Sequence, residues 1–252
     1  MKNKRDVKFD IIFLSYDEPL ADEHWKRLKK RYPFAGRVHG VKGILNAHKK
    51  CAEIAETDYF FVVDGDAYIL DTFSFENIPF KLSEDFFYMW SSRNAVNDLT
   101  YSNGGVKLLP KAFLDDIEDY GLDMFITLPH KNINEVASLS RFNANPFYSW
   151  RAGFRECAQL ACNACKHSKE IKRQLRIYLL NIWCNKGFDR EFGMWCIKGA
   201  RAGRRYGIEN RRNENSITMI NDFDWLRDRF YYELEKGYLK DIASELKEDQ
   251  KP

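Results

Sequence analysis

The first part of the chain alternates between short apolar runs and segments with helical spacing. Residues 9–14, 37–41 and 59–63 read as strands, and residues 21–32 and 47–56 place apolar side chains on one helical face. Asn46 is a candidate N-cap for the second helix. The order strand–helix–strand–helix–strand indicates parallel βαβ units. Residues 86–90 and 102–110 predict two further strands.

The second part of the chain has mostly helical spacing. Residues 134–142, 150–165, 168–184 and 190–202 are predicted helices, with breaks at Asn145-Pro146, near His167 and at Gly187. Residues 217–220 predict a last short strand, Asn221 or Asp222 can cap a final helix, and the tail at 239–252 is amphipathic. We therefore expect one α/β domain over residues 1–252, with a mostly parallel, Rossmann-like sheet flanked by helices and an α-rich C-terminal half.

The strand predicted at residues 59–63 ends in two aspartates, Asp64 and Asp66. A fully apolar run is typical of a central strand that is buried on both faces, and ligands of open α/β sheets bind beyond the carboxyl ends of such strands. Neighbouring carboxylates repel, and hard cations prefer carboxylate oxygen, so the pair favours a divalent cation. The alternative is a turn capped by two aspartates. An EF-hand loop is excluded by Tyr68, Ile69 and Phe75, which stand where that loop needs a ligand, glycine and glutamate.

The composition is that of an ordinary globular chain. Its 252 residues are 44% hydrophobic and 31% charged, which supports one core or at most two small domains. No apolar run reaches the length of a membrane span, and we expect no secretory signal, hence a cytoplasmic protein. The six cysteines fall in helical segments, which favours free thiols over disulfide bonds. A zinc site is suggested by Cys157, Cys162, Cys165 and His167. The spacing of these residues, however, favours buried thiols.

Positive charge is concentrated between residues 166 and 212, although the net charge is only +3. In the two stretches 166–176 and 198–212 only Glu170 and Glu209 are anions, and aromatic residues are interleaved across the region. Such a surface attracts phosphates, whereas the alternative is a solvated helix face. The cations are Lys166, Lys169, Lys172, Arg173, Arg176, Lys198, Arg201, Arg204, Arg205, Arg211 and Arg212.

Three segments resemble GT-A glycosyltransferases, in the order in which those enzymes carry them. Asp64-Gly65-Asp66 resembles their metal-binding DxD motif. Residues 102–106, Ser-Asn-Gly-Gly-Val, are similar to the strand that follows DxD in glycogenin-like and bacterial galactosyltransferase-like members, and residues 9–19 resemble the first strand and nucleotide-contacting loop. The resemblance implies a GT-A fold, with a nucleotide-sugar-binding half at 1–110 and a helical acceptor-binding half at 111–252.

The resemblance also implies a role for each matching residue. Asp66 would bind a catalytic Mn²⁺ or Mg²⁺ bridging the diphosphate of a UDP-sugar, and Asp64 would contact the metal or the ribose. A departing nucleoside diphosphate builds negative charge, which a metal and a nearby cation stabilise. The remaining donor contacts would be Ser15, Tyr16 and Asp17 at base and ribose, Lys42 at the phosphates, and Asn103 and Gly104 at the sugar.

The third metal ligand departs from the family pattern. Many glycogenin-like enzymes supply it from a late histidine-containing segment, whereas the last histidine of this chain is His167. His130, His167 or water could complete the metal's coordination. A lone histidine in a loop is, however, more often a surface residue.

An arginine- and aromatic-rich segment at residues 147–157 follows the predicted sheet, where acceptor contacts usually lie. Arg151 and Arg155 share one helix face and could clamp phosphate oxygens. Glu156 is a candidate general base, and so are Asp189 and Glu191. Helix packing with surface ion pairs explains these residues equally well.

Segments at 14–19, 62–67, 148–156 and 220–226 resemble a narrower group, the bacteriophage glycosyltransferases that modify hydroxymethylated pyrimidines in DNA. The resemblance implies transfer of glucose or an arabinose-like pentose from a UDP-sugar to hydroxymethylcytosine in double-stranded DNA, in the host cytoplasm. The basic region, including Arg201, Arg204 and Arg205, would contact phosphates. Competing interpretations are a glycosyltransferase with a glycan or protein acceptor, a nucleotidyltransferase, and a non-catalytic nucleic-acid-binding protein. A nucleotidyltransferase would need a glycine-rich loop after the first strand, and this chain has none there.

Overall fold

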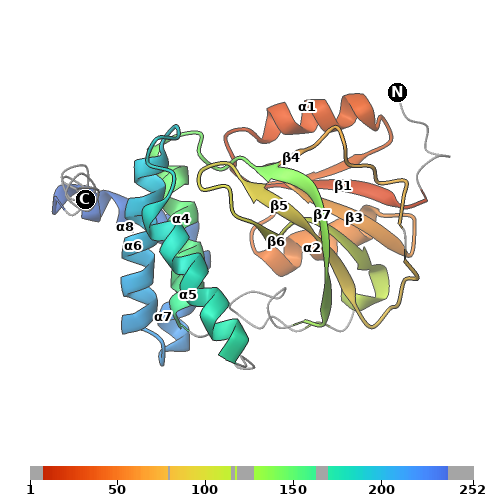
Figure 1. Ribbon diagram of the computed structural model, residues 1–252. Coiled ribbons are helices and arrows are strands. Elements are labelled where there is room, and N and C mark those ends of the chain that lie inside the picture. Colours follow the sequence, from red (N-terminus) through yellow and green to blue (C-terminus); the bar gives the residue numbers. More distant parts are fainter. Residues whose placement is uncertain (1–7, 79, 115–116, 118–127, 163–169, 238–252) are drawn as a thin grey trace. The chain divides into compact units, whose positions relative to one another are not determined.

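The chain divides into a sheet-containing unit and a helical unit (Figure 1). The computed structural model describes residues 8–78, 80–114, 117, 128–162 and 170–237. The sheet unit consists of Met1–Ala95 with Thr100–Arg141, and the helical unit of Val96–Leu99 with Phe142–Pro252. The amphipathic tail predicted at 239–252 lies outside the described residues.

Seven strands form one mixed sheet in the order β2-β1-β3-β6-β5-β7-β4. Pairings β1–β2, β1–β3 and β5–β7 are parallel, and pairings β3–β6, β5–β6 and β4–β7 are antiparallel. The sheet is therefore mixed rather than mostly parallel, with β4 and β6 running against the other strands. The strands are β1 (Asp10–Ser15), β2 (Gly36–His39), β3 (Tyr59–Asp64), β4 (Ala67–Ile69), β5 (Phe87–Asn94), β6 (Thr100–Pro110) and β7 (His130–Ser140).

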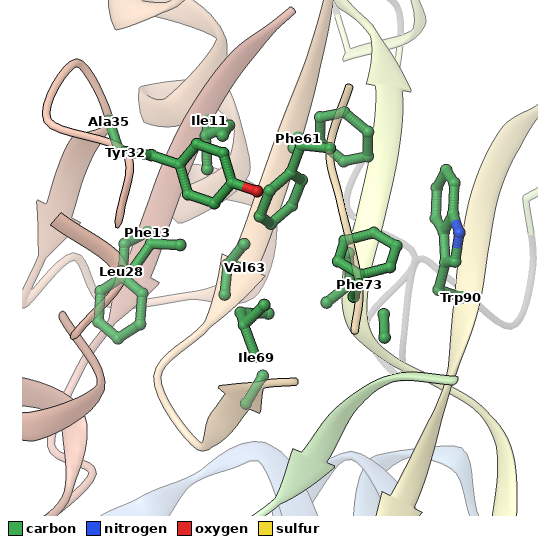
Figure 2. Close-up of a cluster of buried hydrophobic side chains, with 14 of the residues drawn as sticks. Ile11, Phe13, Leu28, Tyr32, Ala35, Phe61, Val63, Ile69, Phe73 and Trp90 are labelled. Carbon is green, nitrogen blue, oxygen red and sulfur yellow. The ribbon is translucent and has the colours of Figure 1, made fainter. Parts of the chain in front are cut away.

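Helices α1 (Ala21–Arg31) and α2 (Ile44–Ile54) cover opposite faces of the sheet (Figure 1). The side chains of β3 alternate between these faces, as the two-residue period of a strand requires. Phe61 and Val63 pack with Leu28 of α1 and with Tyr32, which follows the helix (Figure 2), while Phe60 and Val62 pack on the α2 side. All four β3 side chains are fully buried, which confirms the prediction of a central strand.

Most predicted elements of the sheet unit are confirmed to within a few residues. The exceptions lie at α2 and β7. Gly43 rather than Asn46 precedes the first helical residue of α2, and its φ of 89° suits a residue without a side chain.

The helix predicted at residues 134–142 is wrong, because this segment is strand β7. It pairs in parallel with β5 and antiparallel with β4, so both of its edges are hydrogen-bonded. Ala137, Ser138 and Ser140 are buried in the sheet. Tertiary pairing has overridden a local sequence pattern that is compatible with a helix.

The helical unit contains α4 (Pro146–Cys162), α5 (Glu170–Asn185), α6 (Gly193–Glu209), α7 (Glu214–Thr218) and α8 (Phe223–Glu235). Asn145 caps α4 through Tyr148 N at 3.0 Å, and Asp222 caps α8, as predicted. The strand predicted at 217–220 is wrong, since this segment is helical in α7 and the following 3₁₀ turn. Among the described residues, none of the helices has the length and apolar character that crossing a membrane requires.

Helices α4 and α6 lie unusually close together because glycines of α6 face the backbone of α4. A Cβ atom at Gly203 would overlap the carbonyl oxygen of Phe154, and one at Gly199 would overlap that of Trp150. These positions are four residues apart, so they share one face of α6. Backbone atoms cannot move aside as a flexible side chain would.

We expect Gly203→Ala to destabilise the protein by about 2 kcal/mol or more through overpacking. Arg205→Ala, at an exposed position of the same helix, should change stability by less than about 0.5 kcal/mol. Urea unfolding of both variants measures this difference. Equal midpoints would show that the helices separate without cost.

Candidate functional site

The carboxyl ends of three parallel strands meet at one edge of the sheet, called here the carboxyl edge. Leu14 of β1 pairs with Asp64 of β3, and Ser15 of β1 pairs with His39 of β2. The loops that leave these strands carry Tyr16, Asp17, Lys42 and Asp66. The structure thus brings the predicted residues of the first half to the same edge.

Strand β6 brings the second predicted motif to this edge. Val63 near the end of β3 pairs with Val106 of β6, so residues 103–105 of the antiparallel β6 lie beyond this pair, toward the carboxyl end of β3. A Cβ atom on Gly105 would lie 3.5 Å from the Cβ atom of Ala67, which confirms the proximity. The two motifs, about 40 residues apart in the sequence, are therefore neighbours.

The place where residues 64–66 and 103–105 lie side by side is called here the corner. An ion pair between Asp64 and Lys107 lies at this corner. Lys107 Nζ donates to Asp64 Oδ1 at 2.7 Å. The lysine side chain is only 2% exposed, and the aspartate side chain is 33% exposed. Both residues point to the α2 face, because Lys107 pairs with Val62 and Asp64 follows Val62 by two residues.

The charge of Lys107 is felt by two buried groups of α2. Burial, with the nearby Lys107 charge, lowers the pKa of His48 to about 3. Burial raises the pKa of the Cys51 thiol to about 12, although Lys107 acts in the opposite direction. His48 is therefore neutral at pH 7, and its Nδ1–H donates to Ile44 O at 2.7 Å.

The turn between the two aspartates is held from outside the strand. His24 Nδ1–H of α1 donates to Gly65 O at 2.9 Å, and Arg141 N donates to Asp66 O at 2.8 Å. Glu18 accepts from Tyr16 N at 2.8 Å, and a Cβ atom at Gly65 would lie 2.5 Å from its carboxylate oxygen. Glycine at position 65 thus leaves room for a third carboxylate beside the turn.

Ser15 lies at the end of β1, and its hydroxyl is already held by neighbouring side chains. Arg37 donates to Ser15 Oγ through Nε at 3.2 Å and Nη2 at 3.1 Å, and His39 Nδ1 lies 3.0 Å from the same oxygen. Arg37 also forms an ion pair with Asp22 at 2.8 Å. A ligand above β1 would therefore meet Arg37 and His39 as well as the Ser15 hydroxyl.

Asn103 and Gly104 form the part of β6 that lies at the carboxyl edge. Asn103 Nδ2 donates to Ser140 Oγ at 2.8 Å, and Asn103 Oδ1 accepts from Gly105 N. Gly104 has a φ of 86°, and a Cβ atom there would have only Lys107 side-chain atoms within 4 Å, with Nζ at 3.8 Å. Backbone can therefore approach a ligand closely at Gly104.

The structure does not bring His130 to the aspartates. His130 begins β7 and pairs with Phe87 at the start of β5, whereas Asp64 ends β3. Strands β3, β5 and β7 run in the same direction, so His130 lies at the opposite edge of the sheet. Across residues 8–78, 80–114, 117, 128–162 and 170–237, no three His, Cys, Asp or Glu side chains converge as a metal site would require.

The remaining predicted residues belong to the helical unit, where several have structural contacts. Arg155 donates to Ile220 O at 2.9 Å and to Asn221 Oδ1 at 3.0 Å. Arg151 is 9% exposed and lies over the Phe223 ring. Arg201 donates to Cys184 O at 3.0 Å. These contacts match the alternative interpretation, in which the arginines hold helices together.

Other candidates of the helical unit are more open to solvent. Asp189, Glu191, Arg204 and Arg205 are exposed, and Glu156 is partly buried. Arg204 lines a shallow groove of about 410 Å³ with residues of α5, among them Tyr178 and Asn181. This groove places one predicted phosphate contact beside an exposed aromatic ring.

The cysteines that suggested zinc are buried thiols where the structure describes them. Cys157 and Cys162 are both buried and free of disulfide bonds. Cys165 and His167 lie outside the described residues. The Cys157 thiol is hydrogen-bonded to that of Cys184, and burial raises its pKa.

Sequence reasoning missed Lys107, Glu18, Arg37 and His39 at the carboxyl edge. Lys107 carried a visible signal, because it is the single charge in the apolar run 106–109. A charged side chain inside such a strand needs a partner. The strand register that identifies this partner as Asp64 could not be obtained from the sequence.

Comparisons with known proteins do not identify a relative from which a function could be inferred. No family model, curated protein or solved structure matches this chain. Function must therefore be inferred from the geometry and charges of the carboxyl edge.

Acid should destabilise the fold through His48. Its pKa in the fold, about 3, lies below the ordinary value of 6.5, so the unfolded chain binds more protons below pH 6.5. Stability is then lost as the pH falls from about 6.5 toward 3, by about 2 kcal/mol at pH 5. His48→Leu should flatten this loss in urea unfolding between pH 7 and 5, whereas His130→Leu should not. Parallel pH profiles for wild type and His48→Leu would contradict the assignment.

Proposed function

We propose that this chain is a metal-dependent glycosyltransferase that uses a UDP-sugar. The observation that carries the proposal is the corner formed by Asp64-Gly65-Asp66 and Asn103-Gly104, beside the carboxyl ends of β1 and β2. Crevices of this kind, beyond the strand ends of an α/β sheet, are where nucleotides bind. The mixed sheet is compatible with the proposed GT-A arrangement, because β6 runs antiparallel beside the strand that carries the aspartates.

The donor set suits Mg²⁺ or Mn²⁺ that is bound together with a diphosphate. Mg²⁺ in proteins is commonly held by one or two carboxylates, with phosphate and water oxygens completing its shell. Asp66 is partly exposed beside the turn, and one oxygen of Asp64 accepts a hydrogen bond from Lys107. Asp66 would therefore hold the ion, which would neutralise charge on the departing diphosphate.

The residues around the corner fit a nucleotide donor. Lys42 is exposed in the loop after β2, at the same edge, and can approach phosphate oxygens. Tyr16, Asp17 and the Arg37–His39 pair offer hydrogen bonds for a base or ribose near the end of β1. Asn103 and Gly104 would line the sugar, since Gly104 leaves its surroundings open.

The acceptor that we propose is hydroxymethylcytosine in double-stranded DNA. Helices α5 and α6 carry Lys172, Arg173, Arg176, Lys198, Arg201, Arg204 and Arg205 against Glu170 and Glu209. Such an excess of cations suits a phosphate backbone. The predicted general bases, Glu156 and Asp189, belong to the helical unit. A glycan or protein acceptor, and a non-catalytic nucleic-acid-binding protein, are the alternatives that the experiments below separate.

We expect Asp66→Asn to lower sugar transfer at least about 100-fold, because the charge that holds the ion is lost. The assay incubates the protein with UDP-sugars, Mn²⁺ and DNA containing hydroxymethylcytosine, and then weighs the digested nucleosides. Asp58→Asn is the control, because Asp58 is exposed at the other end of β3. Full transfer by Asp66→Asn would contradict the metal role, and no transfer by wild type to any DNA would contradict the acceptor.

Reversing the charges of Arg204 and Arg205 to Glu should weaken DNA binding. Each lost phosphate contact should reduce the slope of log affinity against log salt by about 0.9. Fluorescence anisotropy at several salt concentrations measures both quantities, and Lys131→Glu, an exposed position of the sheet unit, serves as the control. Unchanged affinity would point to a glycan or protein acceptor.

A further inference from the structure

Lys107 is one of the residues at the carboxyl edge that the sequence did not predict as part of the site. It is a lysine in the middle of a sheet, 2% exposed, and its ammonium lies 2.7 Å from an oxygen of Asp64. A buried lysine is costly unless it is paired, so its charge has a fixed position in the fold. That position lies beside Asp64, two residues before Asp66, the proposed metal ligand.

We infer that Lys107 is a positioning residue that turns Asp64 from a metal ligand into a fixed counter-ion. Divalent metal then enters this corner together with the diphosphate of the donor, and binds poorly without it. The inference rests on the proposed function, because it assigns the roles of residues around the same metal. Its basis is the ion pair, which engages an oxygen that a metal would otherwise use.

The charges of the side chains at the corner predict the direction in which Lys107 changes metal affinity. Asp64, Asp66 and Glu18 contribute three negative charges, and Lys107 contributes one positive charge, so the four side chains sum to a net charge of −2. A divalent cation alone is therefore attracted less than by the three carboxylates alone. A diphosphate, in contrast, would be attracted by the Lys107 ammonium near Gly104, because a Cβ atom at Gly104 would lie 3.8 Å from Lys107 Nζ.

The residues of α2 around Lys107 favour its pairing with Asp64. His48 and Cys51 of α2 lie close enough to feel its charge, and both are neutral at pH 7. Asp64 is thus the carboxylate that pairs with the ammonium, and α2 covers the pair from the same face. Lys107 cannot turn away from the corner without leaving its charge among apolar side chains.

Lys107→Met tests the inference because it should change two affinities in opposite directions. Removing the cation changes the net charge from −2 to −3, so Mn²⁺ alone should bind about tenfold more tightly, while UDP without metal should bind about tenfold more weakly. Mn²⁺ binding is measured by electron paramagnetic resonance and UDP binding in chelator by calorimetry. A merely structural lysine would weaken both affinities or neither.

Two further variants make the result decisive. The double variant Lys107→Met with Asp64→Asn restores the wild-type net charge of −2, so its Mn²⁺ affinity should return to the wild-type value. It also removes the carboxylate left without its lysine, in case the single variant folds poorly. Lys131→Met, at the opposite edge, should behave as wild type.

The outcomes separate this inference from the proposed function. If wild type binds Mn²⁺ in the presence of UDP but Lys107→Met binds Mn²⁺ alone no more tightly than wild type, the inference is overturned and the metal role of Asp66 stands. If wild type binds Mn²⁺ neither alone nor with UDP, the proposed function fails, and the inference fails with it.

Discussion

The buried ion pair between Lys107 and Asp64 is the interaction around which the candidate site is built. It ties β6 to the carboxyl end of β3 on the face that α2 covers. Removing one partner of a buried pair typically costs about 3–5 kcal/mol, because the other charge is left without compensation. The pair therefore fixes the position of the first aspartate, Asp64, before any ligand is bound.

Several independent features give this corner its shape. The parallel register of β1, β2 and β3 brings their carboxyl ends to one edge, and the antiparallel β6 returns Asn103 and Gly104 to the same edge. His24 and Arg141 hold the turn through its backbone oxygens, so the carboxylates themselves need not do so. The polar groups of the edge are thus positioned by the scaffold, as an electrostatic site requires.

Much of this arrangement follows from local patterns in the sequence. The apolar run of β3 and the flanking helices predicted the central strand and the edge at which Asp64 and Asp66 lie. Strand β7 was not predicted, because apolar and polar residues do not alternate regularly over residues 134–142. This segment becomes a strand by pairing with β5 and β4. Lys107 was visible as a charge in an apolar run, but its partner depends on register, and register depends on contacts between distant segments. The same limit applies to His130, which shares a residue type with metal ligands but lies at the wrong end of its strand.

We propose that a divalent ion is held at the carboxyl edge by Asp66 and a diphosphate, beside Asp64, which is paired with Lys107. Crystals grown with Mn²⁺ and UDP test it most directly, through the anomalous signal of manganese. The account predicts a single manganese peak in contact with Asp66 and the diphosphate oxygens, with the Lys107–Asp64 bond intact. An empty corner, or manganese bound by both aspartates with Lys107 displaced, would contradict it.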